Sequence, residues 1–398
     1  MKIRNVFAVM AMATCAIITS GSMNESIVNA ADNEKDFRPM YYGKLNDDKV
    51  DKKHYLDEEV IKGIAWDEKN KKLTLDGFEG DGSISFVIED TKKDRSKYTR
   101  YVEIKGDNKV GALDSDCNLK ISGDGTLGTY RAPENIDKNW YGFSIWTAYN
   151  VEIDSVTLND VWISADELTI KNANLNRKFV PNKRFDNEES KNKKTEYDYT
   201  PWLEAAKMNI NNSVLVADYK YLSKDQKKGK FYASNCIVAN TYNIDSSIID
   251  FKGSRKALNH VIALSQRTAD KSKVRNSNIR LKKGMIISDE LYRYKITKLG
   301  KKRNEVKLIK CDAVVADVVE LNKNLNFLGR KYRLTAIGKG VFFEVVKVTF
   351  KTKNIRKIGK KAFWNYEGKK ITFKVPKSAK KKYMKLLKKA GTKNYVVK

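Results

Sequence analysis

Four short stretches decide the fold that this sequence predicts: VEIDSVTL at 151–158, LTIKNANL at 168–175, MNINNSVL at 208–215 and YNIDSSII at 242–249. Each has an apolar residue at its first position, Ile at its third, Ser or Asn at its fifth and Leu or Ile at its eighth. Apolar residues at alternate positions are typical of a β-strand with one buried face. The stretches are therefore copies of one unit, made of a strand, a corner and a second strand.

The unit extends towards the N-terminus. An Ala stands five residues before each aligned Ile, and an apolar residue stands seven before it: Trp146, Ile163, Leu203 and Ile237. Successive copies are 17, 40 and 34 residues apart. Stacked coils tolerate unequal intervals because the extra residues form loops outside the stack. A Ser or Asn at each corner can form a hydrogen bond with the equivalent residue on the next coil. The pattern predicts a parallel β-helix, with an antiparallel sandwich as the alternative.

Two resemblances refine this prediction. The stretch NLKISGDGTL at 118–127, with the coils after it, resembles secreted bacterial right-handed β-helix proteins of the pectate-lyase-like, carbohydrate-binding domain type. Further on, IGKGVF at 337–342 recurs as IGKKAF at 358–363, which resembles BspA-like leucine-rich repeats of surface proteins. Only two or three such units match, and Val341 replaces the usual Ala in one copy. Together they imply a mainly β protein: a right-handed parallel β-helix followed by a small, basic, β-rich leucine-rich-repeat-like domain.

A C-terminal helix completes the expected fold. Pro376 and Ser378 can open it, Gly391 can stop it, and its apolar residues share one face. The expected order is a signal peptide at 1–30, a polar linker at 31–60, the β-helix at 61–283 and the basic domain at 284–398. Residues 1–30 combine a basic head, a short apolar run and small residues before the cleavage point after Ala30. They predict a secreted, extracellular or cell-surface-associated protein without a transmembrane segment.

Nearly all the positive charge lies in the last third of the chain. Residues 271–398 hold 38 Lys and Arg against 8 Asp and Glu, whereas the other 270 residues hold 40 basic and 41 acidic groups. Such a field favours a polysaccharide or another anionic cell-envelope polymer as partner, and nucleic acid is not expected for an exported protein. The alternative is a generic solvated surface. The candidate anion-binding residues are Lys360, Lys361, Lys380, Lys381, Lys382, Lys388 and Lys389.

Aromatic residues suggest a sugar-binding face on the β-helix. Trp162 and Trp202 stand eight residues before two aligned Ile residues, next to the inward column, so they are expected to point outward on adjacent coils. Exposed indoles form a platform for a sugar ring. The insertion after Arg177 adds the further candidates Phe179, Phe185, Tyr197 and Tyr199. The alternative is that the two Trp residues are packed beneath this insertion.

The sequence offers little for catalysis or metal binding. It has two His residues and, after cleavage, three widely spaced Cys residues. The residues after the aligned Ile positions include Asp154 and Asp245, which would lie three coils and about 14 Å apart. We therefore expect no catalytic residue, no metal and no cofactor, and calcium has no motif here. Asp160, Asp166 and Glu167 are close in sequence, so an active centre built from loops stays open as an alternative.

These observations favour a binding or adhesion protein over an enzyme. Carbohydrate would bind to the β-helix, and the basic domain would bind anionic envelope polymers. Two alternatives stay open: a polysaccharide lyase or hydrolase acting on acidic glycans, and a structural or protein-adhesive surface component. The oligomeric state is not indicated by any pattern in the sequence.

Overall fold

The structure, a computed structural model, describes residues 37–44, 51–88, 94–129, 143–179, 182–183, 196–198, 202–219, 230–231, 233–266, 272–289, 291–312, 318–322, 324–364 and 368–398. The expected signal peptide lies outside these residues. The protein is mainly β, and its longest described helix is α3 (Lys380–Lys389). No helix in the described part of the chain is long and apolar enough to cross a membrane.

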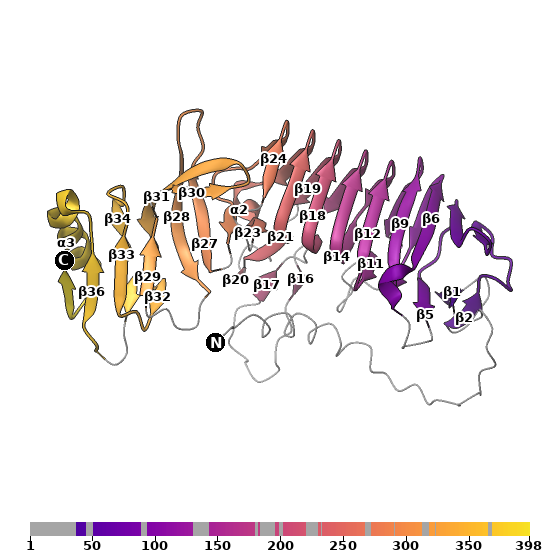
Figure 1. Cartoon of the computed structure of the whole chain (residues 1–398), viewed down its shortest axis with the longest axis horizontal. Helices are drawn as coiled ribbons and strands as arrows, with labels where there is room; N and C mark the ends of the chain where they lie inside the picture. The colour runs from indigo at the N-terminus through magenta and orange to yellow at the C-terminus, as the bar shows by residue number, and fades with distance from the viewer. Residues whose placement is uncertain are drawn as a thin grey trace. The chain divides into compact units, whose positions relative to one another are not determined.

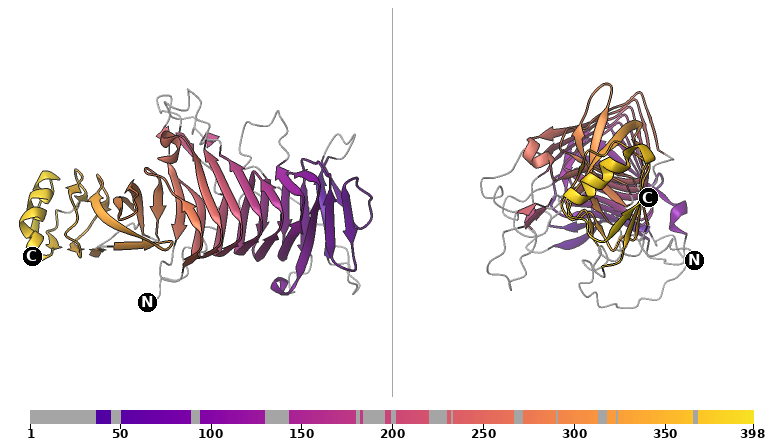
Figure 2. Two further views of the ribbon diagram at one scale, coloured as in Figure 1. Left: turned by 90° about the horizontal axis from the view of Figure 1, so that it is seen from above. Right: turned by 90° about the vertical axis from the view of Figure 1, so that its left-hand side faces the viewer.

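From residue 72 to residue 288 the chain passes repeatedly through three rows of strands, and neighbours within each row pair in parallel (Figures 1 and 2). The first row contains β5 (Ser83–Ile88), β8 (Ala112–Ser115), β11 (Phe143–Thr147), β14 (Val161–Lys171), β18 (Leu203–Asn211), β21 (Ser234–Asp245), β23 (Val261–Gln266) and β26 (Ile286–Ser288). The second row contains β4 (Lys72–Asp76), β6 (Thr99–Lys105), β9 (Asn118–Gly123), β12 (Asn150–Asp154), the second halves of β14, β18 and β21, and β24 (Lys273–Arg275). The third row contains β7 (Asp107–Val110), β10 (Thr126–Thr129), β13 (Thr157–Asn159), β15 (Asn174–Lys178), β19 (Val214–Tyr219), β22 (Ile248–Gly253) and β25 (Asn278–Arg280).

Apolar columns fill the space between the rows. The four aligned Ile residues are strand partners of one another, and each is at most 1 % exposed. The predicted column two residues earlier is also in register and buried: Val151, Leu168, Met208 and Tyr242. Burying one such aliphatic side chain stabilises the fold by roughly 1.5–3 kcal/mol. The core thus follows directly from the alternation in the sequence.

The corner between the second and third rows explains the small polar column. Ser155, Asn172, Asn212, Ser246 and Asn276 occupy it, and all have positive φ between 45° and 60°. Asn tolerates this left-handed conformation better than most residues. In addition, Asn212 Nδ2 donates to Asn172 Oδ1 at 2.9 Å. The predicted bond between equivalent corner residues is therefore present.

A second polar ladder follows one residue later. The backbone N–H of Ala173 donates to Ser213 Oγ, that of Ser213 to Ser247 Oγ and that of Ser247 to Ser277 Oγ, each at 3.1 Å. These bonds satisfy backbone groups that the corner removes from the strand ladders. Consecutive coils are thereby joined at the corner as well as through their strands.

The N-terminal part differs from the expected polar linker. Two strands lie in it, β1 (Phe37–Gly43) and β2 (Lys52–Tyr55), and β1 pairs antiparallel with both β2 and β5. Tyr41 is fully buried and Leu56 is buried too, so this charged stretch also contributes side chains to the core. A hairpin of β3 (Ile64–Asp67) and β4 follows. A 3-10 turn η2 (Arg95–Lys97) precedes β6.

Two shorter features interrupt the rows. A small sheet consists of β16 (Asn182–Lys183), β17 (Glu196–Asp198) and β20 (Lys230–Phe231). The single-turn helix α2 (Arg255–Leu258) begins at the Ser254 cap and precedes β23. Both features lie in segments that connect a third-row strand to the next first-row strand.

The C-terminal part continues with β27 (Tyr292–Lys298) and β28 (Asn304–Cys311), an antiparallel pair next to β26. After it come β29 (Val318–Leu321), β30 (Asn324–Phe327), β31 (Arg330–Ile337), β32 (Phe342–Phe343), β33 (Lys347–Phe350), β34 (Lys357–Ile358), β35 (Phe363–Trp364), β36 (Ile371–Lys374), η5 (Lys377–Ala379), α3 and β37 (Tyr395–Val397). Ile337 pairs with Ile358 and Phe342 with Phe363. The two IGKxxF-type blocks are thus equivalent positions of adjacent circuits.

Helix α3 lies where the sequence placed it. It follows Pro376 and η5, and the chain leaves it at Gly391, whose φ is 71°. Tyr383 and Leu387 are fully buried, while the lysines of the helix are exposed. The Tyr383 hydroxyl donates to the Thr352 carbonyl. The helix therefore covers the last circuits with one apolar face.

Replacing Asn212 tests the corner. Asn212→Ala places a Cβ-bearing residue without a side-chain bond at a φ of 45°, and we expect it to lower the free energy of unfolding by about 2 kcal/mol. Asn212→Gly loses only the bond to Asn172, so its free energy of unfolding should fall by about half as much or less. Urea unfolding of the three proteins measures both values. Equal losses in the two variants would contradict a role for the backbone conformation.

Candidate functional site

A groove lined by basic residues lies on the outer side of the C-terminal strands. One hollow, with a volume of about 510 Å³, is lined by Lys283, Thr297, Lys298, Glu305, Thr335, Ala336, Arg356 and Lys357. A second hollow of about 480 Å³ shares Lys298 and is lined by Lys298, Gly300, Lys301, Lys302, Arg303 and Arg333. We call these two hollows together the basic groove. Eight cationic side chains line it, against one carboxylate.

Strand register brings these residues together. Lys298 of β27 pairs with Glu305 of β28, which pairs in turn with Arg333 of β31. Within β28, Val306 and Leu308 are buried in the core, so the alternating residues Glu305 and Lys307 face outward. Next to them, Ala336 lies between Lys307 and Lys357 on adjacent strands. Ala336 and Lys357 both line the first hollow, and the small side chain of Ala336 leaves room for it.

Glu305 pairs with two of the three arginines that line the groove, Arg303 and Arg356. Its side chain is 6 % exposed, its Oε1 lies 2.8 Å from Arg303 Nε, and its Oε2 pairs with Arg356. A buried carboxylate needs such partners, and losing one of them would leave an uncompensated charge. The single carboxylate is therefore neutralised within the protein. The other cations that line the groove are left as an excess of positive charge.

The predicted anion-binding lysines form a separate basic surface. Lys360 and Lys361 lie in the turn after β34, and Lys380, Lys381, Lys382, Lys388 and Lys389 lie on α3; all are exposed. The Lys361 N–H donates to the Ala390 carbonyl at 2.9 Å, so this turn contacts the end of α3. None of these seven lines the basic groove. Sequence analysis missed the groove, whose one local signal is the KKR run at 301–303 in the β27–β28 turn.

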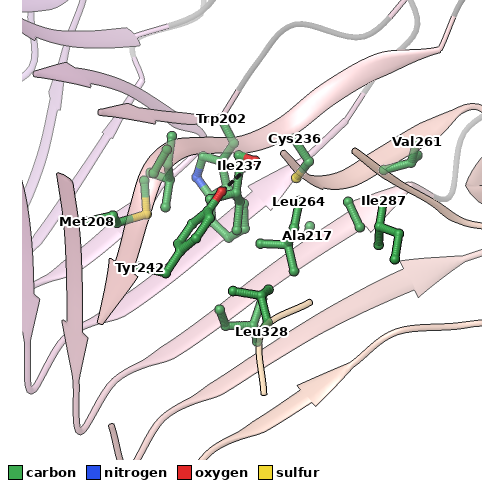
Figure 3. Packing of buried hydrophobic residues seen from close by; sticks show 14 of the residues in the cluster. Trp202, Met208, Ala217, Cys236, Ile237, Tyr242, Val261, Leu264, Ile287 and Leu328 are labelled. Carbon is green, nitrogen blue, oxygen red and sulfur yellow. Dashed lines mark hydrogen bonds between the residues drawn. The ribbon is translucent and has the colours of Figure 1, made fainter. Parts of the chain in front are cut away.

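The predicted tryptophan pair is correct in register, but Trp202 is buried and Trp162 is only partly exposed. The Ile163 N–H donates to the Trp202 carbonyl, so Trp162 and Trp202 lie on adjacent circuits. Trp202 is only 1 % exposed and Phe179 only 2 %. Figure 3 shows Trp202 among Cys236, Ile237 and Tyr242. As ligand contacts Trp202 and Phe179 are therefore corrected to core residues, which agrees with the alternative of packed indoles.

An aromatic cluster at a corner explains this burial. Phe179 stacks on Tyr219 with 4.2 Å between ring centroids, and it meets Trp202 edge-on at 6.1 Å. Trp202 and Leu203 are consecutive and both buried, because the chain re-enters the first row at this point. The usual alternation of inward and outward side chains along a strand therefore does not hold at these two residues. Of the other candidates, Phe185 and Tyr199 lie outside the described residues, and Tyr197 lies in β17.

A different tryptophan is exposed on the first row. The predicted alignment matched Trp146 with Ile163, but the structure pairs Ile145 with Ile163. This circuit has one residue more in its corner, and a shift of one residue moves a side chain to the opposite face of a strand. Trp146 is consequently 38 % exposed, and its neighbours along the row are Asp114 and Ser164. An indole, a carboxyl and a hydroxyl thus line up on the outer face.

Asp114 has an unusual protonation equilibrium. Burial, with a smaller contribution from the charge of Asp116, raises the pKa of Asp114 to about 6. Its carboxyl is therefore protonated for much of the time in mildly acidic solution, when it can donate as well as accept hydrogen bonds.

This pKa predicts how stability depends on pH. The folded protein binds more protons at Asp114 than the unfolded chain between its ordinary pKa of 3.8 and about 6, so stability should fall as the pH rises through this window. In Asp114→Asn, the decrease in stability that the titration of Asp114 causes should be absent. Thermal unfolding at pH 4, 5, 6 and 7 measures it, with Glu79→Gln as control for an exposed carboxylate. An unchanged profile in Asp114→Asn would contradict the raised pKa.

Carboxylates on the second row form ladders with lysines. The predicted column is in register: Asp154, Lys171, Asn211 and Asp245 are partners on successive strands. Beside it, Lys171 Nζ lies 2.7 Å from Glu152 Oε1, and Lys207 Nζ lies 2.7 Å from Glu167 Oε1. The hydrogen bond from Lys171 is the main cause that lowers the pKa of Glu152. The carboxylates of Glu152 and Glu167 are therefore already paired with neighbouring lysines.

The crowded loop carboxylates do not converge. Asp160 Oδ1 accepts from the Lys178 N–H at 2.6 Å, whereas Glu167 Oε1 accepts from Lys207 and Asn209. Within the described ranges no group of three or more His, Cys, Asp or Glu residues is arranged to hold a metal ion. The cysteines in those ranges are Cys117, Cys236 and Cys311, and they form no disulfide.

The basic groove and the outer face around Trp146 are thus the two sites with the clearest chemistry. Comparison with known proteins adds no function to them: no protein-family model, no curated protein and no solved structure matches the chain.

Proposed function

We propose that this is an exported binding protein whose basic C-terminal part binds anionic polymers of the cell envelope. The observation that carries the proposal is the basic groove, in which eight cationic side chains face one carboxylate that two arginines already neutralise. Such a hollow concentrates positive potential, which attracts repeated carboxylate or phosphate groups. Export rests on the composition of residues 1–30, which has the three regions of a signal peptide.

The proposed scaffold is a right-handed parallel β-helix followed by a remnant of leucine-rich repeats. Three rows of parallel strands, a fixed polar corner and inward apolar columns support the first part. The register of the two repeated blocks, Ile337 with Ile358 and Phe342 with Phe363, supports the second. A rigid scaffold of this kind holds charged side chains at regular spacings. A polymer that carries a charge on every repeat unit would fit that regularity.

Reversing charges in the groove tests the main proposal. In Lys298→Glu with Arg333→Glu, we expect binding to polygalacturonate or polyglycerol phosphate at low salt to weaken by roughly tenfold or more, at about 1 kcal/mol per reversed charge. The control is Lys62→Glu with Lys69→Glu, which changes the net charge equally at exposed positions far along the chain from the groove. Isothermal titration at two salt concentrations measures the affinities. If binding weakens equally in both variants, the net charge of the protein and not the groove determines the affinity.

A second candidate function is binding of a neutral glycan on the first row. It is favoured by Trp146, an exposed indole whose strand neighbours are the Asp114 carboxyl and the Ser164 hydroxyl. An indole face packs against the C–H groups of a sugar ring, and the flanking polar groups can bond its hydroxyls. This site replaces the predicted Trp162 and Trp202 pair, because Trp202 is buried.

Trp146→Ala tests this second site. We expect it to abolish binding to those neutral glucans or mannans that the unchanged protein binds, with unfolding free energy altered by no more than about 0.5 kcal/mol. Tyr101→Ala is the control, since Tyr101 is 42 % exposed on the second row. Binding assays should be insensitive to salt. Retained binding in Trp146→Ala, or an equal loss in Tyr101→Ala, would remove the face around Trp146 from consideration.

A further inference from the structure

The last repeat circuits expose a pair of aromatic side chains. In β32 and β35, Phe342 pairs with Phe363 and Phe343 pairs with Trp364. Phe342 and Phe363 are buried and stacked, 5.2 Å apart with 2° between their planes. Alternation turns the following residues to the other side, where Phe343 is 50 % exposed; Val346, three residues further along the chain, is 38 % exposed. Core packing does not require this apolar surface.

Lysines border the aromatic pair. Lys361 Nζ lies 5.7 Å from the centre of the Trp364 ring, a cation–π distance. The Lys361 N–H donates to the Ala390 carbonyl, so the end of α3 with Lys388 and Lys389 adjoins the same turn. We call Phe343, Val346 and Trp364, with Lys360, Lys361, Lys388 and Lys389, the aromatic–lysine surface. This surface contains four of the lysines that the sequence predicted to bind anions. Its apolar residues were not among the predicted site residues.

The ring geometry favours one kind of partner. The Phe343 and Trp364 centroids are 5.9 Å apart and their planes are inclined by 67°. The two rings therefore share no plane on which a sugar face could stack. Aromatic side chains with a cationic border instead match the headgroup region of an anionic bilayer, in which aromatic rings enter the boundary and lysines contact phosphates. Each lysine near an anionic membrane adds to this attraction.

We propose that the aromatic–lysine surface docks the protein on an anionic lipid membrane. Phe343 and Val346 enter the headgroup boundary beside Trp364, and the lysines of the turn and of α3 contact lipid phosphates. Both contributions are needed because a few partly buried apolar side chains, or a few lysines, give only weak and reversible attachment alone. This surface and the basic groove have no lining residue in common. The membrane proposal therefore does not depend on the polymer proposal.

Vesicle binding by the chain from residue 31 onward tests the proposal. We expect it to sediment with vesicles of phosphatidylcholine and phosphatidylglycerol at 70:30, and not with pure phosphatidylcholine. Phe343→Ala should weaken partitioning by roughly fivefold to tenfold, because about half of a Phe side chain no longer leaves water. Val318→Ala is the matched control, since Val318 is an exposed apolar residue of β29. Circular dichroism checks that both variants keep their secondary structure.

The groove variants separate the two proposals. Lys298→Glu with Arg333→Glu should lose most polygalacturonate binding and keep at least half of the vesicle affinity, whereas Phe343→Ala should show the reverse. If Phe343→Ala and Val318→Ala bind vesicles equally well, the aromatic–lysine surface is not the membrane contact. Equal binding to neutral and anionic vesicles, or binding lost only in the groove variant, would likewise overturn it.

Discussion

The fold depends on one backbone constraint, the left-handed residue at the corner between the second and third rows. Asn172, Asn212 and their counterparts take positive φ there, so the chain turns without a Gly and without extra residues. Because the corner has a fixed length from β12 to β25, the strands on both sides stay in register from one of these circuits to the next. The apolar columns, the serine ladder and the lysine–carboxylate ladders all require that register.

Fixed register divides the side chains into two groups. Inward residues are held to apolar types by packing, whereas outward residues are free to carry charge. On the second row this freedom produces pairs such as Lys171 with Glu152, in which charges cancel over about one strand spacing. On the C-terminal strands the same geometry places Lys298 and Arg333 on either side of Glu305, with further cations beyond. The difference between a neutral face and a basic groove therefore lies only in the choice of outward residues.

Much of the stacked part could be predicted from the sequence, because alternation and corner chemistry are local. The Ile column, the polar corner and the limits of α3 agree with the structure. The position of Trp146 could not be predicted, since one extra corner residue reverses its direction. Alternation could not decide between an exposed and a packed Trp202, because the alternation ends where an insertion re-enters the row. The basic groove was missed because its residues come from separate strands whose pairing no local pattern encodes.

The positions of the insertions have a consequence for how such a protein can diversify. The segments between β10 and β11, between β15 and β18, and between β19 and β21 each leave after a third-row strand and return at a first-row strand. The corner between the second and third rows varies by only one residue: its passages after β6 and β9 are one residue longer than the five passages from β12 onward. The large differences in length are thus found at positions that border the first row. New binding specificities can arise there through changes in loop length and composition, while the sequence of the stacked strands stays the same.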